Sequence, residues 1–294
     1  TFLDGGIFVG GGADLGVLPD MAVAVNGTAQ YWMALGDMDG DGWPEIAYGR
    51  TVFTMKGGTL KFLFNGVYGF GGGNASRALS HFVDVDDDGT LELVAGNVAY
   101  KVDGSPLWVS TAPDGFTATG DFDQDGAPEI VVVSGGYIYL VEGKTGAVEI
   151  GPFKIPGNGL GGPPTVADFN GDGFDDAIIG APNAMEAGVY TGAVYLVLND
   201  DGIGGSMSLG EADIRWHGVN RGDQVGAALS TAGDQNLDGY ADIIIGAPGS
   251  DAGGAGSGAA YIVYGMPSDD ALYCAEGDLC PSVSLAAADA VLIG

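Results

Sequence analysis

Three observations indicate that this chain has an all-β fold built from repeats. Hydrophobic residues make up 46% of the 294 residues and come in runs of three to five Val, Ile, Leu, Tyr and Phe, with no sustained helical period. Glycine accounts for 56 residues, which is typical of an all-β protein with many turns. A short acidic motif recurs five times, each time followed by an apolar segment of strand length.

The acidic motif places oxygen-bearing side chains at positions 1, 3 and 5, a glycine at position 6 and an acid at position 9. In chain order, positions 1, 3, 5, 7 and 9 are Asp37, Asp39, Asp41, Trp43 and Glu45; Asp84, Asp86, Asp88, Thr90 and Glu92; Asp121, Asp123, Asp125, Ala127 and Glu129; Asp168, Asn170, Asp172, Phe174 and Asp176; and Asp234, Asn236, Asp238, Tyr240 and Asp242.

This spacing predicts a calcium-binding loop. Ca²⁺ takes six to eight oxygen ligands, and a tight loop directs the side chains at positions 1, 3 and 5 and the carbonyl of position 7 toward one ion. We therefore expect about five Ca²⁺ ions in the chain. Magnesium is the weaker candidate because it keeps its waters. The metal-free alternative is an ordinary Asp/Gly turn, which five copies with an acid at position 9 disfavour.

The loops are not EF-hands, because an EF-hand needs a bidentate Glu at position 12 and a helix on each side. Position 12 holds residues whose side chains are not cation ligands: Tyr48, Ala95, Val132, Ile179 and Ile245. The predicted order is strand, calcium loop, strand.

The spacing of the motif fits a β-propeller whose blades have four short strands. Successive copies begin 47, 37, 47 and 66 residues apart. The two strands around each loop form a hairpin, segments such as 137–141, 193–197 and 260–264 supply third strands, and segments such as 60–64 and 214–216 supply fourth strands. The predicted blades cover approximately 30–76, 77–115, 116–162, 163–221 and 222–294.

Charge restricts the partners. The net charge is −30, and the five motifs contain 20 of the 39 acidic residues. With nine Lys and Arg, neither nucleic acid nor an anionic membrane surface is an expected partner. No apolar run approaches the roughly 20 residues of a membrane helix, so no membrane insertion is expected.

The two cysteines, Cys274 and Cys280, bracket a short polar segment and are expected to form a local disulfide. A disulfide, together with loops that fill at millimolar calcium, predicts an extracellular or cell-surface protein. The chain begins at Thr1 with no visible signal peptide, which we interpret as a processed or excised product.

The fifth motif lies in a longer pattern that closely resembles the FG-GAP repeat of integrin α-subunit propellers. The pattern comprises Gly222–Gly226 (Gly-Asp-Gln-Val-Gly), Gly233–Asp242 and Gly246–Pro248 (Gly-Ala-Pro), and Gly180–Pro182 repeats its last element. The first three copies lack Gly-Ala-Pro and look like the shorter FG-GAP/VCBS-type repeats of bacteria. The resemblance covers roughly 30–294. It implies a β-propeller with its loops on one face, and a calcium role for positions 1, 3, 5, 7 and 9.

Five full blades are visible in the sequence, whereas integrin-like propellers have seven. Residues 1–29 contain strand-like segments but no loop, and are expected to be a partial blade or closing strands. Residues 288–294 match 212–218, so the chain stops at the last strand of the fifth repeat. A fragment of a longer propeller and a closed six-blade ring both remain open.

We predict no catalytic residues, because the sequence contains no Gly-x-Ser-x-Gly and no His-Glu-x-x-His motif. Arg221–Asp223 spells the attachment tripeptide RGD, which we expect to be a coincidence at a blade turn. The four tryptophans are expected to pack between blades more than to stack on sugars. The predicted function is a secreted calcium-binding module for a protein or glycan partner. The alternatives are the propeller of a polysaccharide-active enzyme and a self-associating surface or filament component.

Overall fold

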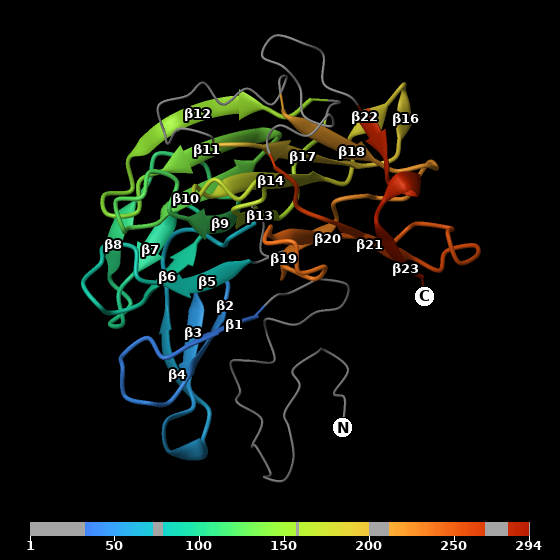
Figure 1. Cartoon of the computed structure of the whole chain (residues 1–294). Helices are drawn as coiled ribbons and strands as arrows, with labels where there is room; N and C mark the ends of the chain where they lie inside the picture. The colour runs from blue at the N-terminus through green and yellow to red at the C-terminus, as the bar shows by residue number, and fades with distance from the viewer. Residues whose placement is uncertain (1–32, 73–78, 157–158, 200–211, 268–281, 294) are drawn as a thin grey trace.

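The computed structural model describes residues 33–72, 79–156, 159–199, 212–267 and 282–293, and the regular elements of this part are strands and short 3₁₀ turns (Figure 1). The predicted partial blade at 1–29, together with Cys274 and Cys280, lies outside the described residues. No helix in the described part has the length and hydrophobicity needed to cross a membrane.

Apart from a two-stranded hairpin, the described strands form five sheets in chain order, and the four strands of each blade pair antiparallel, which confirms the predicted all-β fold of four-stranded blades. The first three sheets contain β1 (Met33–Gly36), β2 (Glu45–Tyr48), β3 (Thr51–Thr54) and β4 (Lys61–Asn65); β5 (Ser80–Val83), β6 (Glu92–Ala95), β7 (Val98–Tyr100) and β8 (Pro106–Val109); and β9 (Phe116–Gly120), β10 (Glu129–Ser134), β11 (Tyr137–Val141) and β12 (Val148–Lys154).

The last two sheets contain β13 (Pro164–Ala167), β14 (Asp176–Ala181), β17 (Ala193–Val197) and β18 (Ile214–His217), and then β19 (Ala228–Gly233), β20 (Asp242–Ala247), β21 (Ala259–Val263) and β23 (Ala290–Ile293). A small hairpin, β15 (Met185–Glu186) and β16 (Val189–Tyr190), projects from the fourth blade. Strand β22 (Ser282–Ser284) comes from the fifth repeat but pairs in parallel with β18, which gives the fourth sheet a fifth strand.

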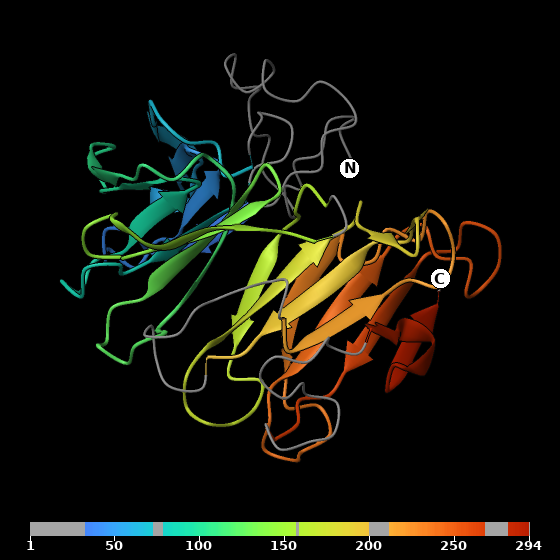
Figure 2. The same ribbon diagram turned by 90° about the horizontal axis from the view of Figure 1, so that it is seen from above.

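The sheets are arranged as propeller blades. The first strand of each sheet lies innermost, and β1, β5, β9, β13 and β19 contact one another in that order. Figure 2 shows the later sheets, yellow to red, packed side by side, with the first sheet, blue, at the other end of the series. Each blade runs from this inner strand outward to its fourth strand.

A separate hydrophobic core fills each space between consecutive blades. Strand β10 shows how the sequence produces two cores from one strand, because alternate residues point to opposite faces. Ile130 and Val132 pack toward the second blade, and Val131 and Val133 pack toward the fourth. All four side chains are buried, so the apolar run of β10 is that of a strand covered on both faces.

Two of the tryptophans pack in these cores as expected. Trp108 lies between the second and third blades and donates from Nε1 to the carbonyl of Gly143 at 2.6 Å. Trp216 lies between the fourth and fifth blades in an edge-to-face contact with Phe169. Trp43 differs, because it lies on an acidic loop and is 42% exposed.

Candidate metal-binding loops

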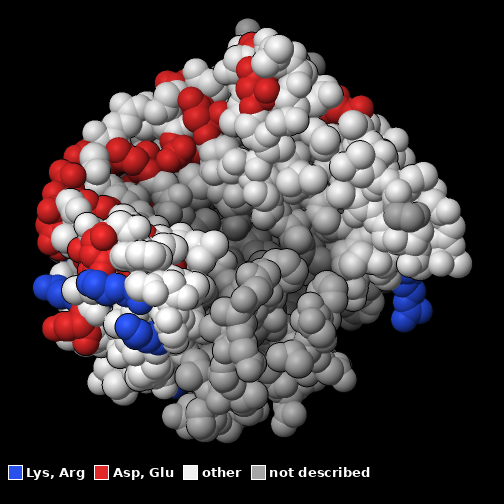
Figure 3. All heavy atoms as spheres, turned by 90° about the horizontal axis from the view of Figure 1, so that it is seen from below, with Lys and Arg blue, Asp and Glu red and all other residues white. Residues whose placement is uncertain are grey.

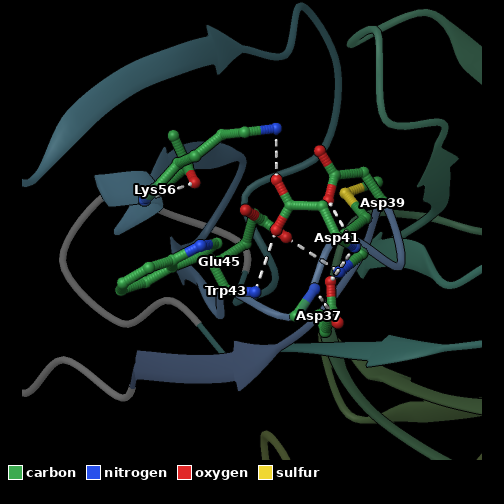
Figure 4. A network of polar contacts seen from close by, with 9 residues as sticks. Asp37, Asp39, Asp41, Trp43, Glu45 and Lys56 are labelled. Carbon is green, nitrogen blue, oxygen red and sulfur yellow. Dashed lines mark hydrogen bonds and ion pairs between the residues drawn. The ribbon is translucent and has the colours of Figure 1, made fainter. Parts of the chain in front are cut away.

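Each acidic motif forms the connection between the first and second strands of a blade, as expected. The flanking elements are strands in all five cases, so the loops are not EF-hands. Figure 4 shows the first loop, where Asp37, Asp39 and Asp41 point toward one another and Glu45 approaches from β2.

Hydrogen bonds within the loop hold the acidic side chains in the same way in all five copies. The position-1 carboxylate accepts from the N–H of the position-6 glycine at 2.8 to 3.1 Å. The position-5 carboxylate accepts from the N–H of position 7 at 2.8 to 3.0 Å. The position-6 glycines have φ between 85° and 97°, a left-handed conformation that favours glycine.

The acid at position 9 is the most buried acidic residue of each loop. Glu45, Glu92, Glu129, Asp176 and Asp242 are each at most 3% exposed. One oxygen of each accepts from the backbone N–H of position 2 at 2.6 to 3.2 Å. The acid therefore closes its loop by joining the first residue of the second strand to the start of the turn.

The residue at position 2 connects the loop to the core between blades. Met38, Val85, Phe122 and Phe169 are buried in the four cores, while their backbone N–H groups bind the position-9 acids. Gln235, the corresponding residue of the fifth loop, is exposed. In the first four loops, the position-9 acid is thus hydrogen-bonded to a residue whose side chain packs between blades.

The first three loops bring together carboxylate oxygens that lie within 4.8 Å of one another, as a cation site requires. The groups are Asp37, Asp39 and Asp41; Asp84, Asp86 and Glu92; and Asp121, Asp123 and Glu129. These nine residues are all ligands predicted from the sequence. Of the remaining side-chain ligands predicted for these loops, the structure does not group Glu45, Asp88 or Asp125 with them.

Unpaired buried oxygens show that these three loops fit a cation. Glu45 Oε1, Asp86 Oδ1 and Asp121 Oδ1 are buried without a hydrogen-bond partner. A buried acceptor without a partner costs about 1–3 kcal/mol, and more when it is charged. Hard carboxylate oxygens are the ligands that Ca²⁺ prefers, so a divalent cation would satisfy these atoms.

Burial changes the acidity of the loops. It raises the pKa of Glu92 to about 7 and that of Asp176 to about 7, against the N–H bonds that favour the ionised forms. It raises the pKa of Glu129 to about 8, again opposed by the N–H bond, and neighbouring acids add to the rise. At neutral pH these three carboxyls are therefore protonated to a larger extent than ordinary acids, and a positive charge beside them would favour their ionised forms.

The fourth and fifth loops differ because position 3 is asparagine. Asn170 donates from Nδ2 to Asp172 Oδ2 at 2.9 Å, and Asn236 donates from Nδ2 to Asp238 Oδ2 at 2.7 Å. An amide N–H thus partly compensates the charge of the position-5 carboxylate. Because an amide stands where the first three loops have a carboxylate, these two loops offer a cation less negative charge.

Two lysines contact the loops, and the sequence motif does not indicate them. Lys56 forms an ion pair with Asp41 (Figure 4), and Lys144 pairs with Asp125 at 2.7 Å. Each lysine comes from a later part of the same blade, at or after its third strand. Asp41 Oδ2 and Asp125 Oδ2 therefore each face a cationic side chain.

Neighbouring loops also contact each other. Asp175 accepts from the N–H of Asp121 at 2.9 Å, and Gln124 donates from Nε2 to the carbonyl of Gly173 at 2.6 Å. Asn199 donates to Asp176 from its backbone and to the carbonyl of Phe122 from its side chain. The third and fourth loops therefore form one connected polar unit, which position counting within a single motif could not show.

In the RGD tripeptide the aspartate is buried, whereas Arg221 and Gly222 are exposed. Asp223 is 1% exposed, and its Oδ2 accepts from the N–H groups of Val219 and Asn220 at 2.8 and 2.7 Å. Its carboxylate therefore closes the turn before β19, in agreement with the expectation of a blade turn.

Comparison with known families identifies the repeats. Residues 121–179 match the model of the FG-GAP-like repeat, and residues 164–197 and 225–263 match that of the FG-GAP repeat. These segments contain the third, fourth and fifth acidic loops.

Among relatives, the chain is 33% identical to integrin alpha pat-2 of Caenorhabditis elegans over 172 residues, which covers 51% of this chain and 13% of that protein. It is 33% identical to integrin alpha-PS2 of Drosophila melanogaster over 168 residues, covering 51% and 11%. The match thus spans about an eighth of the length of these integrins.

Among solved structures, the V. cholerae biofilm matrix protein Bap1 aligns with a TM-score of 0.42 and 19% identity, over 64% of this chain and 28% of that one. The family matches and the recurring loop geometry show that the chain contains FG-GAP-type repeats, and over about half of its length it is similar to integrin α chains.

Proposed function

We propose that the chain is a secreted calcium-binding propeller that acts as a binding or adhesion module for a protein or glycan partner. The single observation that supports this most is the buried acid that closes every loop, together with the unpaired carboxylate oxygens around it. The integrin-like repeats support a binding role for the module as a whole.

In the proposal, each loop holds one Ca²⁺ through positions 1, 3, 5, 7 and 9. When bound, the ion supplies positive charge at the centre of the loop. Ionised position-9 acids then retain their bonds to the N–H of position 2, and position 2 remains in the core between blades. Calcium binding is therefore coupled to blade packing, and removal of the ion loosens the blades.

The chemistry of calcium supports an extracellular setting. Loops of moderate affinity fill at the millimolar calcium found outside cells. Three carboxylates within one loop also repel each other unless a cation lies between them. The protein is thus expected to be a rigid scaffold outside the cell.

Surface charge favours a partner that tolerates an acidic protein. Figure 3 shows Asp and Glu side chains gathered along one side of the face seen from below, with Lys and Arg at a few separate places. A neutral glycan or a protein with basic residues suits this surface, whereas a polyanion is repelled.

The test is binding to arrays of extracellular proteins and of glycans, with calcium and after chelation. We expect specific binding to one class that is lost on chelation and is reduced in Asp86→Ala, a loop variant. Asp251→Asn, which removes a charge from an exposed turn outside the loops, serves as the matched control and retains binding. Absence of specific binding to both arrays, or binding indifferent to calcium, contradicts the proposal.

A further inference from the structure

A chain of hydrogen bonds joins the position-9 acids of the third and fourth loops through Asn199. Glu129 accepts from the N–H of Phe122 at 2.8 Å, and the carbonyl of Phe122 accepts from Nδ2 of Asn199 at 2.7 Å. The backbone N–H of Asn199 donates to Oδ1 of Asp176 at 2.9 Å. Three hydrogen bonds thus connect two acids that belong to different blades, and we call this chain the Asn199 relay.

The Asn199 relay is buried along its whole length. Glu129 and Phe122 are each 1% exposed, Asp176 is 0% exposed and Asn199 is 9% exposed. At such positions water does not replace a lost partner, so a broken bond leaves a buried polar group unsatisfied. The bonded position of each acid is therefore favoured when the other end of the relay is also in place.

The fifth blade shows what the side chain of Asn199 adds. Asn199 lies 23 residues after Asp176, and Gly265 lies 23 residues after Asp242. The backbone N–H of Gly265 donates to Oδ1 of Asp242 at 3.0 Å, so a glycine is sufficient to bind the acid of its own loop. The side-chain amide of Asn199 is not needed for that bond, and it reaches the neighbouring loop instead.

The same stretch of the third loop has two further bonds to the fourth blade. The N–H of Asp121 donates to Asp175, and Nε2 of Gln124 donates to the carbonyl of Gly173. Together with Phe122, positions 1, 2 and 4 of the third loop are thus each bonded to the fourth blade. The geometry of the third loop is therefore set in part by its neighbour.

We propose that Asn199 is a positioning residue that couples the third and fourth loops, so that calcium in either loop raises the affinity of the other. The inference rests on the proposed calcium role of the loops. When Asp176 is fixed by an ion, Asn199 keeps Phe122 and Glu129 in their bonded positions before the third loop fills. The ordering cost is then met once for two ions, which is positive cooperativity, and the coupling is reciprocal.

The relay can be tested separately from the charge of the neighbouring loop. The fourth loop contains four acids, Asp168, Asp172, Asp175 and Asp176, which together with one Ca²⁺ carry a formal charge of −2. A variant with both Asp168→Asn and Asp172→Asn keeps the side-chain shapes and is designed to bind no ion. Its two remaining acids again carry a formal charge of −2. Charge alone therefore predicts no change at the third loop, whereas the relay predicts weaker binding there.

The experiment is a calcium titration of the full chain followed by NMR, with one backbone amide as the probe of each loop. The N–H groups of Gly126 and Gly173 donate to the position-1 carboxylates of the third and fourth loops, so their signals should shift as each loop fills. We expect the Kd read from Gly126 to rise at least about fivefold in the fourth-loop variant. A matched control with Asp37→Asn and Asp41→Asn in the first loop, two blades away, should leave that Kd unchanged.

Two substitutions of Asn199 test the relay itself. Asn199→Ala removes the Nδ2 donor but keeps the backbone N–H that binds Asp176, and Asn199→Asp keeps the shape but replaces that donor with an acceptor. In either background, the effect of vacating the fourth loop on the Gly126 Kd should fall below about twofold. Asn97→Ala is the control, because Asn97 donates from Nδ2 to the carbonyls of Ser110 and Ala112 within one blade, and it should leave the coupling intact.

The relay is overturned if the Gly126 Kd is the same with the fourth loop filled or vacated. It is also overturned if Asn199→Ala and Asn199→Asp retain the full coupling, or if Asn97→Ala abolishes it equally. In these cases both glycines still respond to calcium, so the metal-binding proposal stands. If neither Gly126 nor Gly173 responds to calcium, both proposals fall together.

Discussion

Replacement of Glu129 by glutamine should change stability in opposite directions with and without calcium. Glu129 is 1% exposed, and one of its oxygens accepts from the N–H of Phe122 at 2.8 Å. Glutamine has the same shape and keeps an acceptor oxygen for that bond. The substitution therefore removes the charge and leaves the framework of the loop in place.

The pKa of Glu129 gives the size of the stability change that is expected in the absence of a cation. Burial raises this pKa from 4.5 to about 8. Between these values the folded carboxyl binds more protons than the unfolded one, so the free energy of unfolding falls as pH rises and the loss is complete above pH 8. At pH 7 the loss is roughly 3 kcal/mol, which Glu129→Gln should recover. At pH 4 the two proteins should be equally stable.

With calcium, Glu129→Gln should lower the free energy of unfolding instead of raising it, because the ionised carboxylate binds the cation more strongly than an uncharged amide does. Denaturant unfolding at pH 4, 7 and 9, with calcium and with EDTA, measures both effects. Asp251→Asn is the control for a change in net charge, since Asp251 is exposed. The reasoning is refuted if the natural chain and Glu129→Gln show the same pH dependence in EDTA, or gain equal stability from calcium.

Three other substitutions test separate parts of the structure. Trp108→Ala should cost about 3–5 kcal/mol in denaturant unfolding, because it empties a core and leaves the Gly143 carbonyl without its indole donor; a cost near zero would contradict the packing. Asn236→Asp should increase calcium affinity in the fifth loop, since it supplies a carboxylate and removes the amide contact to Asp238. Calorimetry that shows weaker calcium binding would argue against this loop geometry. Gly126→Ala should lower calcium affinity and lower the free energy of unfolding by about 1–2 kcal/mol, because the φ angle of Gly126 is 91°. An unchanged melting temperature would contradict the left-handed conformation of that turn.

Local pattern was sufficient to predict most of the blades. Alternating or continuous apolar runs gave the strands, and the motif gave the turn between the first and second strand. Segment 137–141 is the third strand β11, as predicted, and the predicted segment 214–216 lies within the fourth strand β18. Each of these features depends on residues close together in the sequence, which is why the sequence could reveal them.

Contacts between distant segments could not be predicted in the same way. Strand β22 leaves its own repeat to pair with β18, and no residue pattern in 282–284 indicates that partner. The lysine pairs of Asp41 and Asp125 depend on where a later turn of the blade lies. The cavity lined by the inner strands β5, β9, β13 and β19 combines a few residues from each of four blades, so it has no sequence motif.

The amount of calcium bound per chain tests the central claim most directly. The full chain is dialysed to equilibrium against millimolar calcium, and bound metal is measured by elemental analysis, with a parallel melting curve before and after EDTA. The account predicts about five bound Ca²⁺ per chain, and a melting temperature that falls by more than about ten degrees on chelation and recovers when calcium returns. A chain that binds no calcium, with the same melting temperature in EDTA, would contradict it.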